Sequence, residues 1–350
     1  PYDSILFVSF GGPEGPEDVM PFLENVVRGK PVPRERLLEV AEHYREFGGV
    51  SPINEQNREI IASVQVALEK RGIMLPIYFG NRNWKPFLVD ALSDMKNDGK
   101  KRALAFFTSL FSCYSGCRQY RENIQAAQEL VGEGAPVVEK VRMGFNHPLF
   151  IDAVAGQAEE ALSLLTAEEK ARAELVFVAH SIPLAMARNC AYEIQLNEAS
   201  RLVTEKLGFS RYTFGFQSRS GPPQQPWLEP DILDVLHDLS AQEKDIVVVV
   251  PIGFVSDHME VMNDLDVEAQ ELAHELGMKM LRAGTPGSHP KFTELVCDLI
   301  AERLEAKNSR LAVGNLAASH DVCPANCCTY DPKSFISMAP KAKDPLQTGS

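Results

Sequence analysis

The run Asp245-Ile-Val-Val-Val-Val250 constrains the fold more than any other part of this sequence. A short, continuous β-branched run is typical of a strand buried on both faces, as in parallel sheets that are covered by helices. A Pro-Ile-Gly turn follows it, and then a segment with helical periodicity. We therefore expect a strand, turn and helix here, placed at the sheet edge where open α/β folds bind their ligands.

Three carboxylates recur in that helical segment. Glu260, Asp264 and Glu268 are spaced at i, i+4 and i+8, which places them on one helical face. Like charges at this spacing destabilise a helix by roughly 0.2–0.5 kcal/mol per pair, so the row has little value for stability. Carboxylate oxygens are ligands for divalent cations such as Mg²⁺, Ca²⁺ and Mn²⁺. The alternatives are a solvated acidic face and a cation site.

A histidine at the end of a second strand favours the cation site. His180 follows the apolar run 175–179, which also has the pattern of a buried strand. A lone histidine is more often a structural hydrogen-bonding residue than a ligand. Paired with Glu260 at a neighbouring strand end, its imidazole becomes a candidate metal ligand, and it also accepts protons near neutral pH.

The bulk composition restricts the class of protein. The chain has 350 residues, of which 45% are hydrophobic and 24% charged, as in ordinary globular proteins. The net charge of −13 argues against nucleic acid as a partner. With no long apolar run and no signal-like start, we expect a cytoplasmic monomer without a transmembrane segment.

Alternation of strands and helices predicts an α/β fold with mainly parallel sheets. We expect two similar Rossmann-like halves, each a four-stranded sheet flanked by helices, with the active-site cleft between them. The halves are expected at 1–150 and 151–306, with the last helix, 289–306, packing back on the first half, and a Cys-containing tail at 307–350. The Gly11-Gly12 turn lacks the spacing of nucleotide-binding loops, so no nucleotide cofactor is expected.

Several separated motifs together resemble the ferrochelatase family from about residue 3 to about residue 305, and most closely its actinobacterial branch. The motifs are Ser9-Phe-Gly-Gly-Pro13, Phe47-Gly-Gly-Val-Ser-Pro-Ile53, Val178-Ala-His-Ser-Ile-Pro183, Gln217-Ser-Arg-Ser-Gly-Pro-Pro223, Pro226-Trp-Leu-Glu-Pro230 and Pro251-Ile-Gly-Phe-Val-Ser-Asp-His-Met-Glu260.

This resemblance implies a chelatase-type fold and roles for the acidic site. His180 and Glu260 would be the catalytic pair, one on each side of the porphyrin, taking pyrrole protons or presenting iron. Which residue does which stays open. Together with Asp264 and Glu268 they would form the metal site, and the latter two would be a path for iron or for protons.

The resemblance also implies porphyrin contacts at five positions. Phe10 stands where many relatives have a tyrosine near the metal. The other four align with residues that hold propionates in related enzymes: Arg28, His43, Ser51 and Tyr120.

Cysteines near the C-terminus predict a metal centre. Cys323-Pro-Ala-Asn-Cys-Cys328 supplies three thiolates, one fewer than an iron–sulfur cluster normally takes. Several ferrochelatases hold a 2Fe-2S cluster with one internal and three C-terminal cysteines, which implies Cys323, Cys327 and Cys328 here. The fourth ligand is expected to be Cys117, with Cys113 as the alternative. Zinc is the rival metal, since four cysteines also hold it.

The resemblance implies insertion of ferrous iron into coproporphyrin III, giving coprohaem III in haem biosynthesis. The substrates would be this porphyrin and Fe²⁺, and a later enzyme of the haem pathway would accept the product. Three alternatives remain open at this stage: a protoporphyrin IX ferrochelatase, a cobalt or nickel tetrapyrrole chelatase, and a porphyrin or haem carrier that senses iron.

Overall fold

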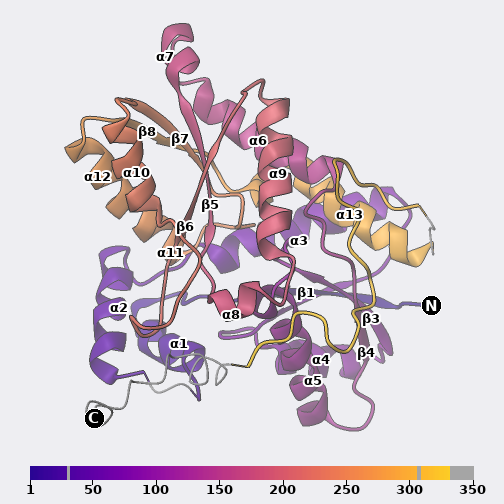
Figure 1. Cartoon of the computed structure of the whole chain (residues 1–350). Helices are drawn as coiled ribbons and strands as arrows, with labels where there is room; N and C mark the ends of the chain where they lie inside the picture. The colour runs from indigo at the N-terminus through magenta and orange to yellow at the C-terminus, as the bar shows by residue number, and fades with distance from the viewer. Residues whose placement is uncertain (30–31, 306–308, 332–350) are drawn as a thin grey trace, which may run out of the picture.

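The computed structural model describes residues 1–29, 32–305 and 309–331, and shows two parallel sheets with helices packed around them (Figure 1). The strand orders are β2-β1-β3-β4 and β6-β5-β7-β8, and every pairing is parallel. The predicted α/β class with two four-stranded parallel sheets is therefore confirmed.

The first sheet and its helices come from the N-terminal part of the chain. Its strands are β1 (Ser4–Ser9), β2 (Ile77–Asn81), β3 (Arg102–Phe107) and β4 (Val137–Lys140). Its helical segments are η1 (Pro16–Asp18), α1 (Val19–Val26), α2 (Arg34–Glu46), α3 (Ile53–Lys70), α4 (Leu88–Asn97), η2 (Tyr114–Arg118) and α5 (Gln119–Val131).

The second sheet follows the same alternation. Its strands are β5 (Glu174–His180), β6 (Thr213–Gln217), β7 (Ile246–Val250) and β8 (Lys279–Arg282). The helical segments are α6 (Pro148–Leu162), α7 (Ala167–Arg172), α8 (Leu184–Ala187), α9 (Tyr192–Lys206), α10 (Ile232–Ala241), α11 (Met259–Val261), η3 (Met262–Ala269), α12 (Gln270–Glu275), η4 (Pro286–Ser288) and α13 (Pro290–Leu304).

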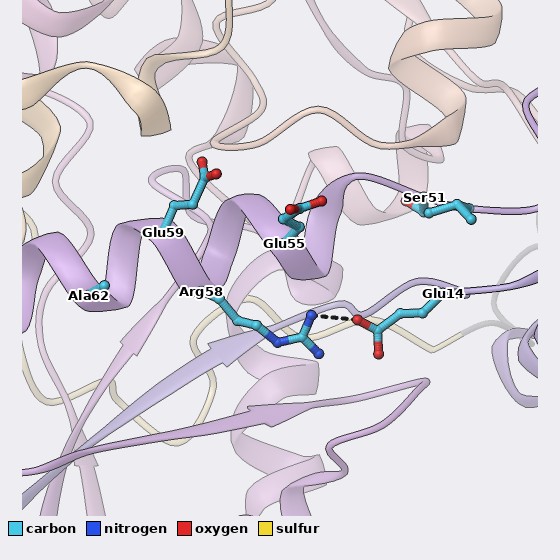
Figure 2. A pocket seen from close by; sticks show the side chains of 7 residues that line it. Glu14, Ser51, Glu55, Arg58, Glu59 and Ala62 are labelled. Atoms are coloured by element: carbon cyan, nitrogen blue, oxygen red, sulfur yellow. Dashed lines mark hydrogen bonds and ion pairs between the residues drawn. The ribbon is translucent and has the colours of Figure 1, made fainter.

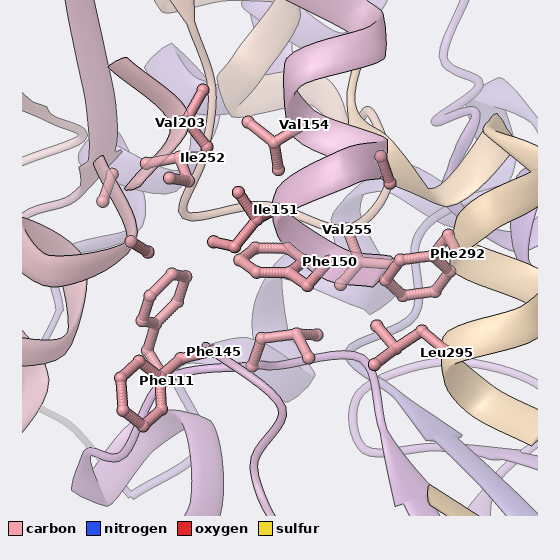
Figure 3. Close-up of a cluster of buried hydrophobic side chains, with 14 of the residues drawn as sticks. Phe111, Phe145, Phe150, Ile151, Val154, Val203, Ile252, Val255, Phe292 and Leu295 are labelled. Carbon is pink, nitrogen blue, oxygen red and sulfur yellow. The ribbon is translucent and has the colours of Figure 1, made fainter. Parts of the chain in front are cut away.

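Burial explains the β-branched runs. All five residues of β7 are buried, because helices cover both faces of the sheet and a parallel strand then has no solvent side. The largest core cluster includes residues of β1 and β3 as well as β5 and β7, so one apolar core continues between the two sheets. Figure 3 shows part of it, where Phe150 of α6 lies between Phe111 and Phe292 of α13. Helix α13 packs against both α3 and α6.

The acidic segment after β7 differs from the expected regular helix. Its first residues form α11, but Met262–Ala269 is a π-helix, and regular α-helix resumes only in α12. A π-helix has i→i+5 hydrogen bonds and therefore wider turns; such turns are rare and often mark functional sites. The sequence periodicity did not reveal the π-helix. Carboxylates four residues apart have a spacing between the repeat of an α-helix and the repeat of a π-helix, so they fit either.

A buried histidine at the start of α6 predicts a pH-dependent stability. The side chain of His147 is fully buried, and burial together with the charge of Arg142 lowers its pKa from 6.5 to about 4. The unfolded chain then binds a proton that the native chain rejects, so stability should fall as pH drops below 6.5 toward 4. We expect a loss of about 2 kcal/mol from this group between pH 7.5 and pH 5.

The measurement is urea unfolding at both pH values for the parent chain and for His147→Asn. Asparagine can keep the helix cap, in which the histidine Nδ1 accepts from the Leu149 amide at 3.2 Å. The variant should lose less stability on acidification than the parent. An equal loss in the two proteins would show that His147 is not the titrating group.

Candidate active site and metal centre

Two side chains meet at the carboxyl end of the second sheet. His180 is the last residue of β5, and its Nε2 lies 3.4 Å from Oε2 of Glu260 at the start of the acidic segment. The imidazole Nδ1 lies 2.5 Å from the Ser181 carbonyl oxygen. Because a carbonyl can only accept, Nδ1 carries the proton of the neutral ring, and Nε2 is left to face the carboxylate.

Each member of this pair shifts the pKa of the other. Burial by itself would raise the pKa of Glu260, but the hydrogen bond and charge of His180 outweigh it and lower the pKa to about 2. Burial opposes the charged form of His180, and the contact with Glu260 outweighs it and raises the pKa. The side chains still keep 35% and 53% of their surface exposed. When the imidazole is protonated, the two side chains form an ion pair within reach of solvent.

The acidic row continues from this pair through hydrogen-bonded amides. Gln217, the parallel partner of His180 in β6, donates from Nε2 to Oδ2 of Asp264 at 3.2 Å, and the Ser218 hydroxyl donates to the same oxygen. Asn263 donates from Nδ2 to Asp264 at 3.3 Å and to Glu268 at 2.9 Å. These donors link the carboxylates of Asp264 and Glu268, and Gln217 also donates to the backbone carbonyl oxygen of Glu260 at 3.3 Å.

Asp264 is the carboxyl group of this row that titrates closest to neutral pH among those with a resolved shift. Burial raises its pKa to about 6, with the negative charges of Glu260 and Glu268 acting in the same direction. The sequence analysis missed Gln217, Ser218 and Asn263 as partners of the row. The motif that begins at Gln217, the last residue of β6, was the available signal for two of them.

Helices of the N-terminal part cover the other side of Glu260. Met259 packs in one apolar cluster with Phe22 of α1, Tyr44 of α2 and Trp84. Burial and the nearby charge of Glu260 both raise the pKa of Tyr44. The site therefore lies where α1 and α2 meet the carboxyl end of the second sheet, as Figure 1 shows for the elements.

A buried polar network joins the strand ends of the two sheets. Asn57 of α3 donates to the Ser9 hydroxyl at 2.8 Å and accepts from the Ser256 hydroxyl at 3.1 Å. Thr108 also donates to Ser9, at 3.0 Å. Polar groups removed from water are costly unless they are paired, so this network fixes how the two ends sit against each other.

Two of the predicted porphyrin residues are brought together by a residue that the sequence analysis missed. The guanidinium carbon of Arg82 lies 5.6 Å from the ring centroid of Phe10 and 5.0 Å from that of Tyr120. Phe10 is 36% exposed at the end of β1, whereas Tyr120 is buried and stacks on Phe107. Arg82 follows β2 directly, so its place at a strand end was the available signal.

The other predicted porphyrin residues belong to the helices and loops of the N-terminal part. Arg28 is exposed after α1, where it hydrogen-bonds to Asn25, and His43 is exposed on α2. Ser51 is buried and lines a pocket of about 580 Å³ with residues of α3 and Glu14 (Figure 2). In that pocket Arg58 pairs with Glu14 at 2.5 Å.

A second set of reactive side chains lies where the C-terminal segment crosses η2. Side-chain donor atoms of His320, Cys323 and Cys327 lie within 4.8 Å of one another. Cys117 of η2 donates a hydrogen bond to Cys323, which raises the pKa of Cys117 and lowers that of Cys323. The structure thus brings Cys117 to the C-terminal thiols.

Cys328 and Cys113 are the two other cysteines considered as ligands. The Sγ atoms of Cys327 and Cys328 are 3.6 Å apart. Cys113 is buried, and its sulfur accepts from the Gly116 amide at 3.1 Å. The Cys117, Cys323, Cys327 and His320 donors are soft sulfur and imidazole ligands, which suit zinc or an iron–sulfur cluster.

Cations of the N-terminal part hold the C-terminal segment in place. Arg118 donates from Nη1 to the carbonyl oxygens of Ala325 at 2.8 Å and of Cys327 at 3.0 Å. Lys140 donates from Nζ to the carbonyl oxygen of His320 at 3.2 Å. The charges of Lys140 and Arg121 also favour the thiolate form of Cys323.

The fold itself is that of the chelatases. Sirohydrochlorin chelatase SirB from Bacillus subtilis subspecies spizizenii, solved in complex with cobalt, aligns with a TM-score of 0.53 at 12% identity, over 89% of this chain and 99% of that chain. SirB from Bacillus subtilis with Fe³⁺ aligns with a TM-score of 0.55 at 13% identity, over 86% of this chain and 95% of that chain.

Sequence comparison then gives the family. The ferrochelatase family model matches residues 2–304. A ferrochelatase of Rhodopirellula baltica is 61% identical over 95% of both chains, and a coproporphyrin III ferrochelatase of Nocardia farcinica is 51% identical over 94% of both. The chain belongs to the ferrochelatase family, and it is accordingly a lyase of haem biosynthesis. None of the described helices is long and apolar enough to cross a membrane.

Proposed function

We propose that this ferrochelatase inserts Fe²⁺ into coproporphyrin III and releases coprohaem III. The observation that carries the proposal is the pair of His180 and Glu260 at 3.4 Å, with a connected acidic row behind it. The choice of porphyrin is supported by relatives named coproporphyrin III ferrochelatase, such as that of Nocardia farcinica at 51% identity.

The reaction exchanges two pyrrole protons for one divalent cation. The pair at His180 and Glu260 supplies both groups that this exchange needs: a proton acceptor and an oxygen ligand. Glu260 is ionised across the neutral range because its pKa is lowered to about 2, so its carboxylate is ready for a cation. Fe²⁺ bound at the Glu260 carboxylate would compete with protonated His180 for that carboxylate, so His180 would release its proton to solvent and its neutral imidazole could accept one pyrrole proton. After passing that proton to solvent, it could accept the second.

The row behind the pair is the proposed route between this site and solvent. Asp264 titrates near pH 6, so it can take and release protons close to neutral pH. Glu268 is exposed and shares the Asn263 amide with Asp264. Oxygen ligands in sequence can replace the hydration waters of a hard or borderline cation one at a time.

Propionate binding is proposed for residues around the rim. Coproporphyrin III carries four carboxylates, so it needs cations and hydrogen-bond donors around an apolar floor. Phe10 and Tyr120 supply apolar surface beside Arg82. Arg28, His43 and Ser51 are proposed as the propionate-binding residues.

The test is anaerobic incubation of the purified chain with Fe²⁺ and either coproporphyrin III or protoporphyrin IX, following the loss of free-porphyrin fluorescence. We expect faster loss, with a haem-type spectrum, for coproporphyrin III. Preference for protoporphyrin IX would contradict the proposed substrate. Tight binding without metallation would point to a carrier, and parallel assays with Co²⁺ and Ni²⁺ would identify a chelatase of another metal.

We also propose that the C-terminal thiols hold a 2Fe-2S cluster. Cys117, Cys323 and Cys327 would be ligands, and when bound the cluster would supply a redox centre and a link between η2 and the C-terminal segment. We expect Cys117→Ser to lose most of the visible absorbance and bound iron of the purified chain. Cys113→Ser is the matched control in the same segment and should keep both. The reverse result would make Cys113 the internal ligand.

A further inference from the structure

We propose that His320 is a ligand of this metal centre, with Cys117, Cys323 and Cys327, and that Cys328 stays outside the ligand set. The inference rests on the proposed metal centre, and it replaces an all-cysteine set by three thiolates and one imidazole. The metal is a thiophilic, tetrahedrally bound ion, either the iron of a 2Fe-2S cluster or zinc.

The donor atoms of His320 and Cys327 have the spacing of two ligands of one metal ion. With metal–sulfur bonds of about 2.3 Å and metal–nitrogen bonds of about 2.1 Å, ligands of one tetrahedral ion are about 3.6 Å apart for nitrogen and sulfur. His320 Nε2 lies 3.6 Å from Cys327 Sγ. Its donor atom and the sulfurs of Cys323 and Cys327 all lie within 4.8 Å of one another. One imidazole therefore lies at the separation of a shared metal from one thiol and close to a second.

Backbone contacts hold this arrangement in place. The carbonyl oxygen of His320 accepts from Lys140 at 3.2 Å, and that of Cys327 accepts from Arg118 at 3.0 Å. Lys140 ends β4 and Arg118 ends η2, so the N-terminal part of the chain holds the backbone of both residues. His320 is itself exposed, and core packing does not explain why its ring turns toward two sulfur atoms.

Cys328 is the competing ligand. Its sulfur contacts that of Cys327, but the residue is only 5% exposed and interacts with Cys190 and Cys113. Its backbone is left-handed, with φ of 53°, a conformation that few residues other than glycine adopt. The set whose donors lie within 4.8 Å of one another contains His320, Cys323 and Cys327 and does not contain Cys328. Cys117 is also outside that set, but it hydrogen-bonds to Cys323, one of its members.

The experiment compares three variants of the full chain, purified without oxygen: His320→Ala, His320→Cys and Cys328→Ser. Iron, acid-labile sulfide and zinc are counted per chain, which separates a cluster from a zinc site. Metal retention is then measured against a chelator. We expect His320→Ala to retain metal at least about tenfold more weakly, while Cys328→Ser retains it as the parent does. His320→Cys should keep the metal, because a thiolate replaces the imidazole.

A spectroscopic signature separates ligation from a hydrogen bond. If the metal is iron, the reduced centre is paramagnetic, and nitrogen-15 histidine should change a strong hyperfine coupling only when imidazole binds iron. If the metal is zinc, cobalt exchanged into the site should show different absorption in the parent and His320→Ala.

Retained metal in His320→Ala would overturn the proposal, and so would loss of metal in Cys328→Ser. Coproporphyrin metallation is measured on the same preparations. If only the ligand set is wrong, the preparations still metallate coproporphyrin. If only the proposed function is wrong, metal retention still changes in His320→Ala as expected. The two failures are therefore distinguishable.

Discussion

Glu260→Gln is expected to reduce iron insertion by at least about 100-fold while coproporphyrin III still binds. Glutamine has nearly the same shape but no charge, so it can neither attract Fe²⁺ nor accept a proton. It also removes the partner that raises the pKa of His180. Single-turnover metallation measures the chemical step, and fluorescence titration with the porphyrin measures binding.

A matched control removes one negative charge nearby. Glu271 is an exposed residue of α12, beyond the acidic row, and Glu271→Gln should metallate at the parent rate. Turnover of Glu260→Gln within threefold of that control would remove Glu260 from the mechanism. Loss of porphyrin binding in Glu260→Gln would instead assign the residue to the binding of the macrocycle.

Glu302→Gln is expected to destabilise the chain by about 3–5 kcal/mol, because it leaves a buried arginine without its counter-charge. Arg142 donates to Glu302 through Nε at 2.7 Å and Nη2 at 2.9 Å, and the two side chains are 1% and 9% exposed. Nη2 also donates to the carbonyl oxygen of Leu311 at 2.8 Å, so the pair anchors the C-terminal segment to α13.

Urea unfolding compares this variant with Glu39→Gln, which breaks an ion pair whose partners are 66% and 63% exposed. The control should cost less than about 1 kcal/mol, because water screens exposed charges. If the two variants lose similar stability, the buried pair does not contribute as proposed. The double variant Arg142→Met with Glu302→Leu should recover much of the loss, since it leaves no buried charge.

The sequence by itself determined the class of fold and placed the proposed site residues at strand ends. Buried parallel strands need continuous apolar residues, and this local signature predicted β7 and the class of fold. Parallel strands also end at a common edge, so His180 and Glu260 were expected to meet, and they lie 3.4 Å apart. The choice of Cys117 over Cys113 came from family resemblance, and in the structure Cys117 contacts Cys323.

Only the tertiary structure decided which distant residues meet. Arg82 lies between the rings of Phe10 and Tyr120, and Arg118 of η2 holds the C-terminal segment at Cys327. These contacts join segments far apart in sequence, and they depend on packing and on the pairing of buried polar groups. The π-helix at Met262–Ala269 is local, but the residue spacing does not distinguish it from an α-helix. Sequence periodicity indicates which face of a helix or strand is buried. Which residues pack against that face depends on the tertiary structure.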